Sequence, residues 1–238
     1  MKPEHLAQTL SDLARTLQDE DNLADTLNAI VAAAVETIPG ARYAGMTVVR
    51  GRRAVDTRAA TDDLVRRIDQ VQRDAGQGPC LDAVYEQQTV RVSDLARETR
   101  WPHFTGRGLE LGVRSMLSFQ LYVVHDNLSA LNLYSPEVGA FDDESEQVGL
   151  LFASHAAVAM AGARRQNDMD KAVATRDLIG QAKGILMERY RLTADQAFIL
   201  LVRASQHTNI KVAEMARTLT QTGVFVPPAR RGPSADRR

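Results

Sequence analysis

The sequence predicts an α+β domain, an antiparallel sheet flanked by helices, joined by a long helix to an all-α bundle of three helices. Strand and helix patterns follow one another without the regular alternation of a doubly wound sheet. No proline interrupts residues 142–182, which favours one long helix, and three helical patterns are found within residues 176–222. The chain therefore divides into a mixed first part and a helical second part.

Length and composition are those of a globular protein. The chain has 238 residues, of which 44% are hydrophobic and 25% are charged. Its only cysteine, Cys80, allows neither an intrachain disulfide nor a metal cage of thiolates. The longest apolar stretch, residues 150–163, is shorter than the roughly 20 residues of a membrane span. We therefore expect a cytoplasmic protein without membrane contact.

The first part begins with two helical stretches in residues 1–40, and we assign residues 1–19 to a separate N-terminal helix. Alternation of apolar and polar residues predicts four strands, at residues 43–49, 89–92, 114–121 and 128–134. The first of these strands is expected to turn back as a hairpin, and the last two to pair as another. Helical spacing predicts a helix over residues 61–74. Residues 20–163 are expected to form this domain.

The long helix begins with an acidic first turn at residues 142–146, where negative charge stabilises a helix N-terminus. Its polar middle, residues 164–175, is predicted to be a solvent-exposed helical connector. Apolar residues recur at multiples of seven, at Leu151, Val158, Ala172 and Ile179. Arg165 interrupts this repeat, so a coiled-coil homodimer and a monomer both remain open.

The helical second part is predicted to contain three short helices, the first starting at residue 176. Thr193 and Gln196 form a capping box at the start of the second helix, whose buried stripe is expected to include Phe198. Thr208 or Asn209 is expected to cap the third helix. Each helix buries one apolar stripe, so together they predict a small bundle.

Charge is distributed unequally along the chain. Residues 171–238 hold 12 basic and 5 acidic side chains, a net +7, whereas residues 1–170 hold 17 and 25, a net −8. Residues 223–238, rich in Pro, Gly and Arg, are expected to be a disordered basic tail. Cationic side chains gain free energy by releasing counterions from phosphates, so nucleic acid is the first expected partner. The alternative is that the arginines of the tail inflate the positive charge of this segment, which would then not indicate a nucleic-acid partner.

Motifs of the common enzyme active sites are absent. The sequence contains no GxxxxGK[ST], GxSxG, HExxH or GxGxxG segment. Its five histidines lack the spacing of metal ligands, and Cys80 has no resolving cysteine, so a small buried residue is expected there. We expect no enzyme activity, no cofactor and no metal.

Two segments carry family motifs. Residues 176–222 resemble the ANTAR domain, an RNA-binding module of bacterial antitermination regulators; the motifs are IGQAKGILM (179–187), the Ala197-Phe198 step and RASQHTNIKV (203–212). Residues 20–163 resemble the GAF sensor domain; the motifs are GPCLDAV (78–84), RWPHF (100–104), VRSMLSF (113–119) and ALNLYS (130–135). Ser129 departs from the glycine that GAF domains often place before ALNLYS.

The ANTAR resemblance implies binding to paired hairpins in leader RNA that compete with a transcription terminator. The expected RNA contacts are Lys183, Arg203, Ser205, Lys211, Arg176 and Gln181. Because a mid-helix glycine costs about 1 kcal/mol relative to alanine, Gly184 indicates the close approach of another helix or of a ligand backbone. With few aromatic residues and Phe198 expected to be buried, polar and cationic contacts should dominate.

The GAF resemblance implies a sensor for a small-molecule ligand, which the sequence does not identify. Met46, Phe119 and Asn132 are candidate pocket residues, with membership of the plain core as the alternative. A structural or dimerising role of this half also remains open. For the whole chain the alternative function is a ligand-sensing GAF module whose helical bundle binds a protein partner.

Overall fold

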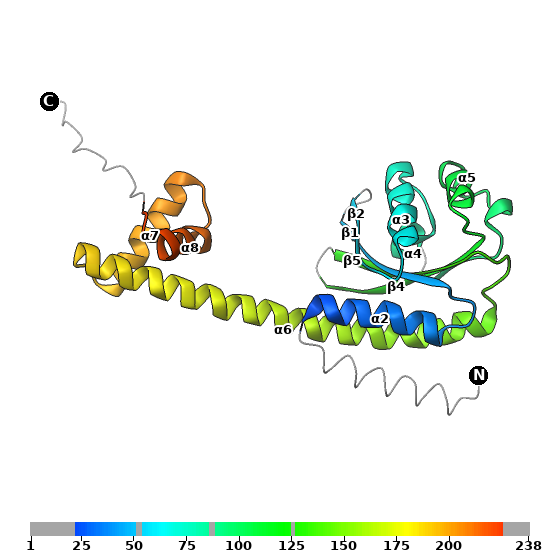
Figure 1. Ribbon diagram of the computed structural model, residues 1–238, viewed down its shortest axis with the longest axis horizontal. Coiled ribbons are helices and arrows are strands. Elements are labelled where there is room, and N and C mark those ends of the chain that lie inside the picture. Colours follow the sequence, from blue (N-terminus) through cyan, green and yellow to red (C-terminus); the bar gives the residue numbers. More distant parts are fainter. Residues whose placement is uncertain (1–21, 51–53, 86–88, 125–126, 226–238) are drawn as a thin grey trace. The chain divides into compact units, whose positions relative to one another are not determined.

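The computed structural model describes residues 22–50, 54–85, 89–124 and 127–225 (Figure 1). The chain divides into two compact units, Met1–Gln166 and Asn167–Arg238. The predicted N-terminal helix, residues 1–19, and most of the predicted basic tail lie outside the described residues.

A five-stranded antiparallel sheet forms the centre of the first unit. Its strands are β1 (Tyr43–Arg50), β2 (Ala54–Ala60), β3 (Thr89–Val92), β4 (Ser115–Val124) and β5 (Asn127–Ser135). They lie in the order β2-β1-β5-β4-β3. The four predicted strands and both predicted hairpins, β1 with β2 and β4 with β5, are confirmed.

One face of the sheet packs against α2 (Leu23–Thr37) and the N-terminal part of α6 (Asp143–Tyr190), as Figure 1 shows. Asn22 is the N-cap of α2 and accepts two backbone hydrogen bonds. Gly149 lets α6 approach the sheet, because a Cβ atom there would lie 2.3 Å from Cζ of Phe119. The core of this face is therefore closely packed.

Three helices cover the other face: α3 (Asp63–Ala75), α4 (Pro79–Tyr85) and α5 (Pro102–Glu110). Asp62 is the N-cap of α3, and its side chain accepts a hydrogen bond from a backbone N–H. The sequence did not predict α5, whose two glycines, Gly106 and Gly108, weaken its helical pattern. A short 3₁₀ helix, η2 (Leu95–Arg97), precedes it.

The helix α6 has 48 residues, so the predicted long helix is confirmed. The predicted separate first helix of the bundle is wrong, since residues 176–190 continue α6 without a break. At the start of α6, Asp142 accepts hydrogen bonds from the backbone N–H and the hydroxyl of Ser145, both 2.9 Å long. These bonds hold the pKa of Asp142 below its ordinary value.

The second unit contains the C-terminal part of α6 with α7 (Ala194–Thr208) and α8 (Val212–Thr222). The predicted capping box of α7 is confirmed. The N–H of Thr193 donates to Oε1 of Gln196 over 2.9 Å, and the N–H of Gln196 donates to Oγ1 of Thr193 over 3.3 Å. The helix start is thus fixed by its own side chains.

The predicted cap of α8 at Thr208 or Asn209 is wrong. Lys211 is the N-cap of α8 and makes no side-chain capping hydrogen bond. Asn209 instead ends α7 in the left-handed conformation, with φ 56°, which asparagine adopts more readily than most residues. None of the helices in the described part of the chain combines the length and the apolar character needed to cross a membrane.

Candidate nucleic-acid interface

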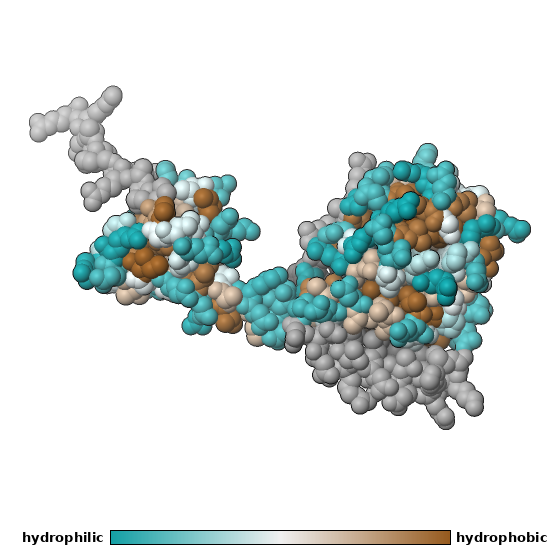
Figure 2. Space-filling view, in the orientation of Figure 1, coloured by the Kyte–Doolittle hydropathy of each residue, from teal (hydrophilic) through white to brown (hydrophobic). Residues whose placement is uncertain are grey.

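The second unit has a small core made by the facing stripes of its three helices. The buried members are Ala182, Leu186, Ala197, Leu201, Ala204, Met215, Ala216 and Leu219. Because a helix turns by about 100° per residue, side chains that flank these stripes are held at the surface of the bundle. The space-filling view shows how apolar and hydrophilic residues alternate over this surface (Figure 2).

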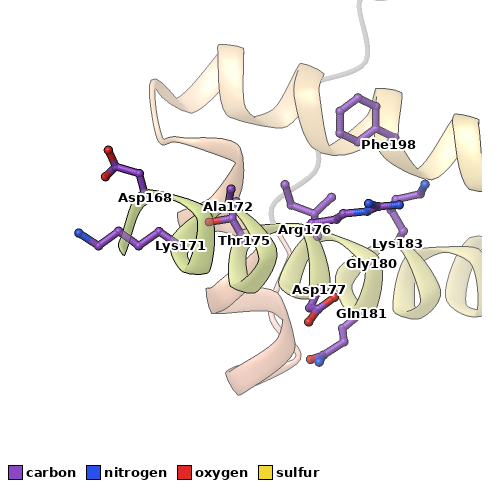
Figure 3. Close-up of a pocket in the computed structure, with 11 residues that line it drawn as sticks. Asp168, Lys171, Ala172, Thr175, Arg176, Asp177, Gly180, Gln181, Lys183 and Phe198 are labelled. Atoms are coloured by element: carbon purple, nitrogen blue, oxygen red, sulfur yellow. The ribbon is translucent and has the colours of Figure 1, made fainter. Parts of the chain in front are cut away.

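A hollow of about 1020 Å³ lies between α6 and Phe198 of α7, and is called the α6 hollow below (Figure 3). Three of the predicted RNA contacts line it, Arg176, Gln181 and Lys183, together with Lys171, which the sequence analysis missed. Figure 3 shows Arg176 and Lys183 extending beneath the ring of Phe198, whereas Gln181 points away from it. The hollow therefore has a cationic side.

Two carboxylates also line the α6 hollow, Asp168 and Asp177. Figure 3 places Asp168 at the end away from Lys183, and Asp177 on the side of α6 opposite Phe198. Of the charged groups that line the hollow, Lys183 and Arg176 are thus on the side of the ring and the two carboxylates are away from it, so an anion can approach there.

Phe198 is 43% exposed, so the prediction that it is buried is wrong. The Nζ atom of Lys183 lies over its ring, 5.9 Å from the centroid. The buried stripe of α7 is formed by Ala197, Leu201 and Ala204, and Phe198 lies about 100° around the helix from the first of these. Phe198 therefore lies at the edge of the stripe and faces the α6 hollow.

The other predicted RNA contacts lie elsewhere in the unit. The hydroxyl of Ser205 donates a hydrogen bond to the carbonyl oxygen of Ile210, the residue before Lys211, so these residues are neighbours near the end of α7. Arg203 is exposed on α7. Arg203, Ser205 and Lys211 do not line the α6 hollow, in which the three predicted contacts on α6 are found.

Gly184 faces open space. A Cβ atom at Gly184, like one at Gly180, meets no other atom within 4 Å. The interpretation that another helix of this chain approaches Gly184 is therefore wrong for the described residues. The other interpretation, approach by a ligand backbone, agrees with the open surface.

The candidate GAF pocket residues do not share a cavity. Met46 and Phe119 are fully buried in the core that faces α2 and α6. Asn132 is also fully buried, but it lies on the opposite face of the sheet, where its Nδ2 atom donates to Oγ1 of Thr47 over 3.0 Å. No single pocket can therefore contain all three.

A cluster of buried polar groups lies on that same face, under α3 and α4. The carboxylate of Asp69 accepts hydrogen bonds from Oγ1 of Thr57 over 2.7 Å and from the hydroxyl of Tyr134 over 2.9 Å. The thiol of Cys80 lies 3.1 Å from Oγ1 of Thr47. Sequence analysis missed Asp69 because an acidic residue beside the apolar stripe of an amphipathic helix is normally exposed.

Burial changes the acid-base properties of this cluster. It raises the pKa of Asp69 to about 6, an effect that the hydrogen bonds from Thr57 and Tyr134 partly oppose. It also raises the pKa of Cys80 to about 12, so the thiol stays protonated at neutral pH. The predicted burial of Cys80 is confirmed. Among the described residues, no three histidine, cysteine or acidic side chains are grouped as metal ligands would be.

Two of the quoted GAF motifs contact one another. Nε1 of Trp101, from RWPHF, donates a 2.9 Å hydrogen bond to Asp82 of GPCLDAV. The guanidinium of Arg100 lies 4.2 Å from the centroid of the Trp101 ring. These residues thus join α4 to the start of α5 and have a structural role.

The family models match most of the chain. The GAF domain model matches residues 20–161, and the ANTAR domain model matches residues 167–219. No curated protein matches the sequence.

Solved structures resemble the first unit in fold. The GAF domain of a phosphoenolpyruvate-protein phosphotransferase from Coxiella burnetii aligns with TM-score 0.55 and 18% identity, covering 71% of this chain and 99% of that one. An N-acylhomoserine lactone dependent LuxR family transcription factor from Burkholderia cenocepacia aligns with TM-score 0.54 and 20% identity, covering 68% of this chain and 99% of that one. A free methionine-R-sulfoxide reductase from Neisseria meningitidis aligns with TM-score 0.51 and 16% identity, covering 68% of this chain and 91% of that one. At these identities the likeness is one of fold.

Proposed function

The chain belongs to the GAF family and carries an ANTAR domain after its GAF domain, and from this premise we propose that it is an RNA-binding regulator of transcription antitermination. This architecture is typical of regulators without enzyme activity. In the proposed role the ANTAR bundle binds tandem hairpins in leader RNA. The GAF domain controls that binding in response to a small molecule.

The observation that carries the proposal is the cationic side of the α6 hollow. Arg176 and Lys171 are exposed and Lys183 is half-buried, and all three line the same hollow. Because α6 carries all three, their backbone positions are fixed relative to one another, and their charges are concentrated where a phosphate backbone can contact them. Arg203 and Lys211 extend the proposed contact over the rest of the bundle.

Tandem hairpins require two ANTAR bundles, either in a stable dimer or brought together on the RNA. Four of the exposed apolar side chains along α6 support a homodimer; these four are Leu151, Val158, Met169 and Val173. Their spacings of 7, 11 and 4 residues are close to whole numbers of helical turns, which places them on one face of the helix. A second copy of α6 is the simplest partner for such a face.

The helix α6 is also the proposed route by which the GAF domain controls the bundle. Its N-terminal part packs against the sheet through Val148, Phe152 and Ala156, and its C-terminal part supplies Ala182 and Leu186 to the bundle core. A ligand that changes the packing of the sheet would therefore act on the same helix that holds the RNA contacts.

The proposal is tested by titrating the full chain with tandem-hairpin leader RNA at several salt concentrations. We expect Lys183→Gln to weaken binding and to lower the slope of log affinity against log salt by about one, because one phosphate contact is lost. Arg67→Gln, which removes an exposed charge from α3, is the matched control and should change neither.

A wild-type protein that does not bind this RNA at low salt would contradict the proposal. Capture of an acidic protein partner that persists after ribonuclease treatment would instead support the alternative, a GAF module whose bundle binds protein.

A further inference from the structure

We infer that Phe198 is a stacking platform for an unpaired RNA base, which enters the α6 hollow and lies on the ring while Arg176 and Lys183 hold the adjoining phosphates. This inference rests on the proposed function. It adds a base-stacking contact to a surface otherwise described only by its charge.

The ring of Phe198 is available to a ligand. It is 43% exposed, and Phe198 is not a member of the bundle core, whose α7 residues are Ala197, Leu200, Leu201 and Ala204. The core of the bundle is therefore complete without this ring. A half-exposed phenylalanine whose ring faces a hollow is the kind of surface on which bases stack in proteins that bind single-stranded RNA.

The groups around the ring match the two chemical parts of a nucleotide. Nζ of Lys183 lies 5.9 Å from the ring centroid, and Figure 3 shows Arg176 extending beneath the same ring. A nucleotide carries a flat aromatic base and an anionic phosphate a few bonds apart, so it can meet the ring and the cations together. The open surface at Gly180, which lines the same hollow, allows the RNA backbone to approach α6 closely.

A purely apolar occupant fits this hollow less well. It would cover Phe198 but would also remove Arg176 and Lys183 from water without giving them a partner, which costs free energy. A purely anionic occupant would pair with the cations and leave the ring exposed. An unpaired base with its phosphate satisfies both, which is why we assign an RNA loop to the site rather than a duplex stem, whose bases are already stacked.

The test compares variants of the full chain in binding to tandem-hairpin leader RNA. Phe198→Leu keeps an apolar side chain without a ring, and Phe198→Trp keeps an aromatic surface. We expect Phe198→Leu to weaken binding about 10- to 100-fold and Phe198→Trp to retain most of the wild-type affinity. Neither variant should change the salt dependence, because no charge is lost.

Tyr190 provides the matched control. It is 44% exposed and belongs to the same unit, but it does not line the α6 hollow. Tyr190→Leu should leave RNA affinity within about twofold of the wild type. Thermal unfolding of each variant checks that the bundle remains folded.

A second measurement identifies the base. 2-Aminopurine is placed in turn at each unpaired loop position, and we expect its fluorescence at one position to be quenched by wild-type protein but not by Phe198→Leu. Wild-type binding together with unchanged affinity of Phe198→Leu would overturn the stacking inference and leave the proposed function intact. Absence of wild-type binding would remove the proposed function and the inference with it.

Discussion

The two phenylalanines Phe119 and Phe198 show how differently the two domains use the same side chain. Phe119 is fully buried in the GAF domain, where α6 has a glycine, Gly149, against its ring. Phe198 is 43% exposed in the ANTAR domain and has a lysine over its ring. The first is held by packing from every side, whereas the second keeps a surface free. Only the second can therefore contact another molecule without unfolding.

A buried carboxylate of the GAF domain and two arginines of the ANTAR domain differ in the same way. Asp69 of the GAF domain is fully buried and accepts hydrogen bonds from Thr57 and Tyr134 of the same domain. The side-chain amide of Gln72 also donates to it, over 3.4 Å. Arg176 and Arg203 of the ANTAR domain are exposed. A buried carboxylate determines shape and stability, and an exposed cation is available to phosphates. These groups thus differ in what they can meet: Asp69 contacts only its own domain, whereas the two arginines are open to other molecules.

The largest expected effect separates the two phenylalanines. Phe119→Ala should lower the free energy of unfolding of the GAF domain by about 3–5 kcal/mol, because it removes a buried ring and leaves a cavity. Phe198→Ala should lower stability by less than about 1 kcal/mol, since its ring lies outside the core cluster. Urea unfolding of the full chain, followed by circular dichroism, measures both. Equal destabilisation by the two substitutions would contradict the comparison.

A second effect concerns the pH dependence of stability. The pKa of Asp69 is about 6 in the folded protein against 3.8 as the ordinary value, so between these two pH values the folded state holds a proton that the unfolded state has lost. Stability conferred by this group is therefore present at low pH and is lost as pH rises through about 6. The size of this effect is about 3 kcal/mol.

Asp69→Asn removes the titrating group but keeps a side chain that can hydrogen-bond to Thr57 and Tyr134. We expect the variant to be more stable than the wild type at pH 7, and we expect this advantage to vanish near pH 4. Urea unfolding at several pH values between 4 and 8 measures the difference, and other titrating groups cancel in it. Asp74→Asn, on the exposed side of α3, is the control and should show no such trend. Parallel curves for wild type and Asp69→Asn would refute the assignment.

Much of this architecture follows from local sequence patterns. The strands β1, β3, β4 and β5, the long helix α6 and the capping box at Thr193 were all predicted, because each depends on alternation, helical period or a cap that neighbouring residues define. The family motifs then identified both domains. The helix α5 was missed, since Gly106 and Gly108 interrupt its pattern and its packing on α3 depends on the tertiary fold.

The candidate site was harder to predict, because it depends on which flank of a helix the core covers. Phe198 fits the apolar stripe of α7 on the sequence, but the stripe that packs against the other helices contains Leu201 and Ala204 and leaves Phe198 at its edge. Similarly, Met46 and Asn132 were grouped as pocket residues, although the sheet separates them. The sequence places side chains on an element, and the tertiary structure decides which of its faces is open.

The smallest expected effect tests the open face of α6 in the ANTAR domain. Gly184→Ala should raise the free energy of unfolding by about 0.5–1 kcal/mol, because the added Cβ meets no atom within 4 Å and alanine favours the helix. We expect the same substitution to weaken RNA binding, since the absence of a Cβ atom at Gly184 leaves the helix backbone open to a ligand. Gly162→Ala is the matched control: it lies in the same helix before the ANTAR domain, and its Cβ also meets no atom within 4 Å. It should stabilise the helix by a similar amount and leave RNA affinity unchanged. If both variants bind RNA as the wild type does, Gly184 does not contact RNA.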